Sequence, residues 1–119
     1  GFRLCGDGTK GIRAECRIGG SDLNPYLAQA AMLAAGIKGI EDNMELAPPT
    51  RGDVYEDAKA QDIPQTLRAA TETLRNSVML RAAMGDDVID HYTRNAEWEQ
   101  EEFDRVVTDW EIARGFERA

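Results

Sequence analysis

The stretch from Ile12 to Ile18, IRAECRI, constrains the fold of this chain more than any other. Apolar and charged residues alternate along it without a break, which is typical of a β-strand with two unlike faces. The apolar face holds Ile12, Ala14, Cys16 and Ile18. The opposite face holds Arg13, Glu15 and Arg17. Charged neighbours on one face of a strand lie about 6.6 to 7 Å apart.

A shorter strand is predicted before it, in residues 1–6, because GFRLCG is followed by the turn signal Gly6-Asp7-Gly8. The two strands and their short connection predict an antiparallel pair over residues 1–18. Arg3 can then join the charged face of the second strand. Cys5 and Cys16 lack the CxxC spacing of a zinc or redox motif, so we expect two buried free thiols near each other.

Residues 24–119 have the pattern of a helical region. Asparagine is a good N-cap and proline suits the first helical position, so Asn24 and Pro25 predict a helix start. The run from Pro25 to Ile37 is apolar on nearly every side, which predicts burial on nearly every side. We expect part of that cover to come from sequence outside this chain, which begins inside a strand pattern as a fragment would.

The acidic residues 41–62 contain Pro48-Pro49 and show no period, so we expect a surface loop. A second helix is predicted to begin near Asp62, with Pro64 in its first turn.

Two more helices are predicted after it. A short one runs from Val78 to Met84 and stops at Gly85, and a long final one begins at Asp86 or Asp87. The apolar stripe of the final helix continues at helical spacing from Val88 to Ala113. The predicted fold class is therefore α+β, a short antiparallel strand pair followed by four helices.

The charge of the chain excludes some partners. The net charge is −8, and residues 51–119 hold nine basic and sixteen acidic side chains, a net of −7. Such a surface repels phosphate backbones, which argues against nucleic acid or an anionic membrane as a partner. No apolar stretch reaches the roughly 18 to 20 residues of a membrane span. The single histidine, His91, is expected to be a packing or surface residue.

The charged face of the second strand allows two interpretations. One is an exposed face with local ion pairs, each worth about 0 to 1 kcal/mol. The other is a phosphate site, because the guanidinium groups of Arg13 and Arg17 offer planar forks of donors that fit phosphate or carboxylate oxygens. Glu15 between them suits one ligand of a magnesium ion.

Three runs form one joint motif: Arg13-Ala-Glu15-Cys-Arg17, Asn24-Pro25-Tyr26-Leu27, and an alanine-rich stretch ending Ala-Gly-Ile-Lys-Gly-Ile. This motif resembles the glutamine synthetase family, with its R-x-E-x-R strand, NPYL turn and following helix. Later segments are similar to that family's C-terminal helices, so the whole chain, residues 1–119, resembles the C-terminal part of its catalytic domain. The usual proline after the R-x-E-x-R strand is Gly19 or Gly20 here.

The resemblance implies a role for each charged residue. Glu15 stands where the family has a ligand of the catalytic Mg²⁺ (or Mn²⁺). Arg3 and Arg13 stand where catalytic arginines contact the phosphates of ATP. Arg17 stands where an arginine holds the carboxylate of the substrate glutamate.

The activity implied is an ATP-dependent, cytoplasmic, homo-oligomeric ligase that forms γ-glutamyl phosphate and transfers the glutamyl group to ammonia, giving glutamine. This chain alone is expected to be inactive, because the family's other metal ligands and its nucleotide pocket lie upstream. Two alternatives stay open: a ligase of the same family that uses another amine, and a non-catalytic helical oligomerisation module.

Overall fold

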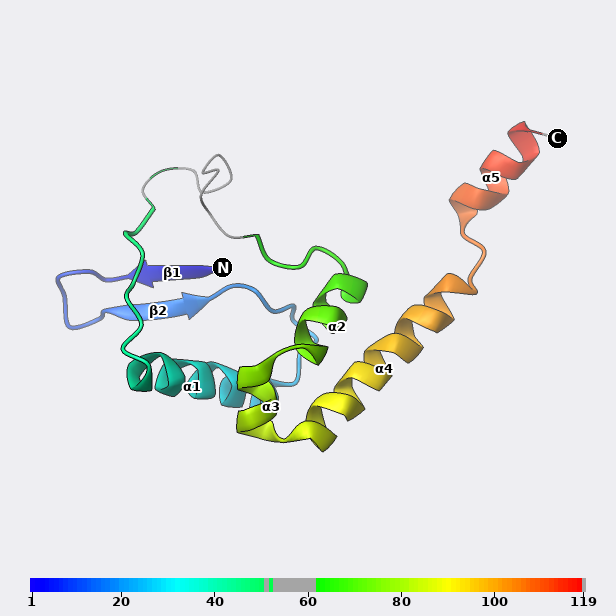
Figure 1. Ribbon diagram of the computed structural model, residues 1–119. Coiled ribbons are helices and arrows are strands. Elements are labelled where there is room, and N and C mark those ends of the chain that lie inside the picture. Colours follow the sequence, from blue (N-terminus) through cyan, green and yellow to red (C-terminus); the bar gives the residue numbers. More distant parts are fainter. Residues whose placement is uncertain (51, 53–61, 119) are drawn as a thin grey trace. The chain divides into compact units, whose positions relative to one another are not determined.

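The computed structural model describes residues 1–50, 52 and 62–118, which form two strands and five helices. They divide into two compact units, residues 1–63 and residues 64–119. The first unit contains the strands β1 (Phe2–Cys5) and β2 (Arg13–Cys16) and the helix α1 (Pro25–Glu41) (Figure 1). The predicted α+β class is confirmed. No helix in the described part of the chain is long and apolar enough to cross a membrane.

The two strands form an antiparallel hairpin, as the alternating pattern predicts. Phe2 lies opposite Cys16 and Arg3 lies opposite Glu15. Since neighbouring residues of a strand face opposite sides, Phe2 and Leu4 share the apolar face, and both are about two-thirds exposed (69% and 68%). Within unit 1, the hairpin therefore presents one apolar and one charged face.

The register corrects the expectation for the two cysteines. Cys5 shares the face of Arg3 and Glu15, whereas Cys16 shares the face of Phe2, so the thiols point to opposite sides. Both are free, as expected, but neither is buried: Cys5 is half-buried and Cys16 is exposed.

The turn between the strands requires glycine at its start. Gly6 has a φ of 72°, in the left-handed region that glycine adopts without strain. A Cβ atom on Gly6 would also lie 2.6 Å from the carbonyl oxygen of Gly11. Thr9 closes the turn, because its hydroxyl donates to the carbonyl oxygen of Gly6 over 2.7 Å.

Helix α1 begins where the sequence predicts. The side-chain oxygen of Asn24 accepts hydrogen bonds from the backbone N–H groups of Tyr26 and Leu27, at 3.0 and 3.3 Å, and Pro25 is the first helical residue. The helix continues to Glu41, four residues beyond the predicted Ile37.

The predicted burial of α1 is wrong for this chain. The helix has no buried residue, and Tyr26 and Ile40 are 84% and 79% exposed. An apolar helix is buried only where other elements pack on every side of it. The residues described in unit 1 do not supply such a cover, although the apolar composition of the helix predicted one.

The second unit consists of α2 (Leu67–Arg75), α3 (Val78–Met84), α4 (Asp86–Asp104) and α5 (Asp109–Glu117). Helices α2 and α3 both pack against α4 (Figure 1). Ile89 of α4 is the one fully buried large side chain in the described part of the chain, at 2% exposure. Gly85, at a φ of 87°, separates α3 from α4 and confirms the predicted stop.

Helix α2 begins later than predicted. Asp62 and Pro64 precede it without helical structure, and Thr66 is the N-cap, with its hydroxyl accepting from the N–H of Ala69 over 3.1 Å. The threonine cap fixes the first helical residue at Leu67. Pro64, which the sequence places in the first turn, therefore belongs to the segment before the helix.

The predicted long final helix is two helices. Helix α4 ends at Asp104. The backbone N–H groups of Arg105 and Val106 then donate hydrogen bonds to the carbonyl oxygens of Glu102 and Phe103, three residues back, which tightens and ends the last turn. Helix α5 then starts afresh at Thr108, which forms a capping box with Glu111. The N–H of Thr108 donates to the Glu111 carboxylate at 2.8 Å, and the N–H of Glu111 donates to the Thr108 hydroxyl at 3.3 Å. This reciprocal pair is the signature of a new helix start, which the apolar spacing conceals.

We expect Thr108→Ala to destabilise α5 by about 1 kcal/mol, because the first turn loses the acceptor for one of its free N–H groups. Hydrogen exchange of the α5 amides should accelerate while that of α4 stays unchanged. Thr73→Ala, which removes a hydroxyl bonded within α2, serves as the control and should leave α5 unaffected. Equal exchange rates in α5 for both variants would rule out the capping role.

Candidate functional site

The charged face of the hairpin gathers two guanidinium groups around one carboxylate. Arg3 donates to Oε2 of Glu15 through Nη2 at 2.6 Å and through Nε at 3.0 Å. Arg13 approaches the other oxygen, Oε1, with its Nη2 at 3.3 Å. Glu15 has 28% of its side chain exposed, against 56% for Arg3 and 63% for Arg13. The carboxylate is therefore the sheltered member, and the guanidinium groups remain accessible to an anionic ligand.

Cys5 is the fourth member of this face. Its thiol donates to Oε1 of Glu15 over 3.1 Å. The hydrogen bonds from Cys5 and then Arg3 lower the pKa of Glu15, and the nearby charge of Arg17 adds to the effect. The hydrogen bond to Glu15 likewise raises the pKa of Arg3. The carboxylate is consequently ionised at neutral pH, with donors at both oxygens.

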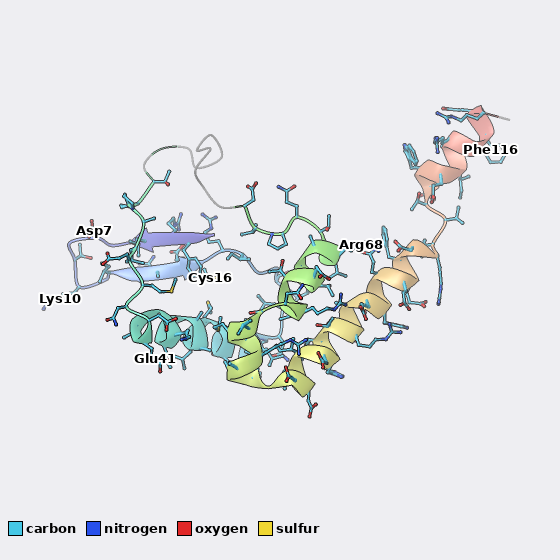
Figure 2. The ribbon with its side chains drawn as sticks, viewed as in Figure 1. Asp7, Lys10, Cys16, Glu41, Arg68 and Phe116 are labelled. Carbon is cyan, nitrogen blue, oxygen red and sulfur yellow. The ribbon has the colours of Figure 1, made fainter. Side chains whose placement is uncertain are left out.

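The structure brings together three of the four predicted site residues. Arg3 and Arg13 each contact Glu15, whereas Arg17 lies just beyond β2. The backbone N–H of Arg17 donates to the carbonyl oxygen of Gly1 at 2.8 Å, which extends the strand pairing, and its side chain acts on Glu15 through charge. Figure 2 shows the hairpin with Asp7 and Lys10 at its turn.

Sequence reasoning missed Cys5 as part of the site. The signal was present, because Cys5 stands two residues after Arg3 and must share its face of the strand. His91, by contrast, packs edge-on against Tyr92 with 5.6 Å between the ring centroids, in agreement with its predicted packing or surface role.

The donor set fits a metal ion only in part. Glu15 offers the carboxylate oxygens that Mg²⁺ prefers, but Mg²⁺ requires an octahedral set of six oxygen ligands. Within the described residues, no three histidine, cysteine or acidic side chains gather into a group that could hold a metal. The charged face of the hairpin therefore offers a single carboxylate, which is fewer ligands than Mg²⁺ needs.

A hollow of about 650 Å³ lies between α2 and α4 in the second unit. Ion pairs occupy its walls: Arg75 bridges Glu72 and Glu97, and Arg94 contacts Glu101 at 3.1 Å. Arg75 of α2 thereby contacts Glu97 of α4, whereas Arg94 and Glu101 both lie on α4. Arg68 of α2 also pairs with Asp104 of α4 at 2.8 Å, so the pairs that cross between the helices have a structural role in joining α2 to α4.

Comparison with known proteins identifies the family. The sequence matches the family described as glutamine synthetase, catalytic domain, over residues 1–115. The chain belongs to this family. The predicted resemblance is thereby confirmed along nearly the whole chain.

Three similar proteins of known name differ in the product or amine that their names give. The chain is 47% identical over 117 residues to a gamma-glutamylethanolamide synthetase of Streptomyces coelicolor, covering 98% of this chain and 25% of that protein. It is 36% identical to the glutamine synthetase of Thermus thermophilus, covering 87% of this chain and 25% of that protein. It is 35% identical to a glutamate–isopropylamine ligase of Pseudomonas, covering 86% of this chain and 23% of that protein. The chain thus spans about a quarter of the length of the curated relatives it matches.

The contacts of Glu15 predict a pH dependence of the hairpin. Because folding lowers the pKa of Glu15 below its ordinary value of 4.5, the ionised carboxylate stabilises the hairpin above that pH. The stabilisation should disappear as the pH falls through the lowered pKa. Backbone chemical shifts of β1 and β2, followed by NMR from pH 7 to pH 2, would report the hairpin population.

Glu15→Gln is the informative variant for this titration. It should populate the hairpin less at pH 7, and the difference from the unmodified chain should vanish at the acidic end. Glu45→Gln removes a carboxylate outside the hairpin and should reproduce the unmodified profile. If the Glu15→Gln profile matches the unmodified one at every pH, the ionised carboxylate of Glu15 does not stabilise the hairpin and the prediction is wrong.

Proposed function

We propose that this chain is part of an ATP- and magnesium-dependent ligase that activates the γ-carboxylate of glutamate and joins it to an amine. Membership of the glutamine synthetase family supports the ligase class. The observation that carries the residue assignment is the contact of Glu15 with Arg3 and Arg13 on one face of a hairpin. Glutamine formation from ammonia is the first candidate reaction.

Two steps make up the proposed reaction. An oxygen of the γ-carboxylate attacks the γ-phosphorus of ATP, and ADP leaves with the electrons of the broken P–O bond. The amine nitrogen then attacks the carbonyl carbon of γ-glutamyl phosphate, loses a proton and displaces phosphate. Charge spreads over the phosphoryl oxygens in the first step, so catalysis depends on cations placed beside them.

The chain's own residues would supply part of that environment. Arg3 and Arg13 carry permanent positive charge on exposed planar forks, which suits bidentate contact with phosphate oxygens. Glu15 would give one oxygen to a bound Mg²⁺ or Mn²⁺, which neutralises phosphoryl charge when present. Arg17 would pair with the carboxylate of the substrate glutamate. Other protein groups would have to complete the site. We propose that a homo-oligomer brings some of them together.

We expect Glu15→Ala in the full-length protein to lower kcat by about 100- to 1,000-fold, the usual cost of losing one preorganised electrostatic contact in a transition state. Release of inorganic phosphate at saturating ATP, glutamate and amine measures the effect. Glu99→Ala on α4 removes an exposed carboxylate of the second unit and should retain full turnover.

The non-catalytic alternative makes the opposite prediction. If the chain were only an oligomerisation module, Arg13, Glu15 and Arg17 could be replaced together without loss of turnover. Full activity of Glu15→Ala at saturating magnesium would therefore sink the ligase assignment of these residues.

A second candidate function differs in the amine. The 47% identity to a gamma-glutamylethanolamide synthetase, against 36% to the Thermus glutamine synthetase, favours a hydroxyalkyl amine as acceptor. The two candidates share the glutamate-activating step, so the residues of the hairpin serve both.

An amine panel on the full-length protein separates these candidates. If the second candidate is correct, ethanolamine should support faster phosphate release than ammonium or isopropylamine at equal concentration of the free base. Mass spectrometry of the product, glutamine or a γ-glutamyl amide, confirms which bond forms. Faster turnover with ammonium would reject the second candidate and leave glutamine synthesis as the reaction.

A further inference from the structure

The thiol of Cys5 contacts the carboxylate of Glu15 in a way that the proposed reaction does not yet use. Cys5 is the last residue of β1 and lies opposite Arg13, one position along the face from the pair of Arg3 and Glu15. From this diagonal position its Sγ reaches Oε1 of Glu15 at 3.1 Å. Cys5 and Glu15 are the half-buried residues of the hairpin, while the arginines around them are exposed.

The two carboxylate oxygens have different donors. Oε2 accepts both hydrogen bonds from Arg3, at 2.6 and 3.0 Å, and Oε1 accepts from Cys5 at 3.1 Å and from Arg13 at 3.3 Å. The terminal torsion of glutamate is broad, so contacts of this kind determine the plane of the carboxylate. Cys5 has a short side chain attached directly to the strand and can hold Oε1 with little freedom of its own.

Charge distinguishes Cys5 from the arginines. A divalent cation approaching Glu15 is repelled by the guanidinium groups of Arg3 and Arg13. Both groups pair with the carboxylate in this structure and would have to turn away, toward phosphate oxygens, for the cation to bind. The thiol is an uncharged donor in this hydrogen bond, so its contact with Oε1 is compatible with a cation bound to the same carboxylate. Groups that orient a metal ligand in this way commonly determine a substantial part of the metal affinity.

We propose that Cys5 is a positioning residue that orients the carboxylate of Glu15 for a divalent cation. This inference rests on the proposed function, in which Glu15 is a ligand of Mg²⁺ or Mn²⁺. It assigns a role to a side chain on β1, and it predicts that the metal affinity depends on a hydrogen-bond donor at residue 5.

The test uses Mn²⁺ alone as the probe, with the full-length protein and without ATP, so that binding is measured independently of turnover. Electron paramagnetic resonance of free Mn²⁺ gives the Kd. Cys5→Ala should raise the Kd about tenfold, as expected for loss of a group that orients a metal ligand. Cys5→Val, which also lacks a donor but keeps the strand preference, should do the same if Cys5→Ala folds poorly. Cys5→Ser should restore most of the affinity through its hydroxyl.

Cys16 provides a matched control, because it is the other free cysteine of the hairpin and lies on the opposite face. Cys16→Ala should bind Mn²⁺ as the unmodified protein does. Unchanged Mn²⁺ affinity in both Cys5→Ala and Cys5→Val would overturn the inference.

Glu15→Gln separates this inference from the function on which it rests. If Glu15→Gln weakens Mn²⁺ binding and the Cys5 variants do not, the metal assignment stands and the role of Cys5 is rejected. If Glu15→Gln binds Mn²⁺ normally, the metal role of Glu15 is wrong, and the role of Cys5 is rejected with it.

Discussion

Pairing of Arg3 with Glu15 across the hairpin is the interaction on which the candidate site depends. The two residues lie directly opposite each other in the paired strands, so their side chains connect the strands in addition to the backbone pairing. A salt bridge on a protein surface usually contributes little stability. Here the main consequence of the contact is geometric, because it holds a carboxylate and accessible guanidinium groups on one side of a stiff support. The alternation in IRAECRI ensures that this side is separate from the apolar one.

Much of the fold could be predicted from local sequence signals. The antiparallel pair followed from the alternation and the glycine turn, the start of α1 from Asn24-Pro25, and the end of α3 from Gly85. These features depend on backbone chemistry within a few residues. The break between α4 and α5 was equally local, yet the capping box at Thr108 was hidden by an apolar spacing that continues across it. Where a cap and a periodicity disagree, the cap decides the boundary.

The burial of α1 and the contact of Cys5 depend on residues that are distant in the sequence, so local signals could not predict them. Apolar composition predicts that α1 should be buried, but burial depends on neighbours, and this chain spans only about a quarter of its curated relatives' length. Alternation along the second strand was enough to predict that Arg13 and Glu15 share one face, and the expected strand pairing added Arg3 to it. The spacing of Cys5 from Arg3 places it on the charged face, but its contact with Glu15 also required the register between the strands, which spacing within one strand does not provide. The functional roles of the arginines and of Glu15 stay predictions.

The tight connection at Gly6 limits which residue can begin the turn of this hairpin in evolution. Its backbone approaches that of Gly11 too closely for any side chain at residue 6. A slip of the strands by one position would exchange the charged and apolar sides of one strand. An insertion within the connection forces no such slip, because extra residues can lengthen the loop while the strand pairing stays unchanged. Homologues can therefore vary in loop length and keep this arrangement of charges, as long as the residue that begins the turn adopts a positive φ.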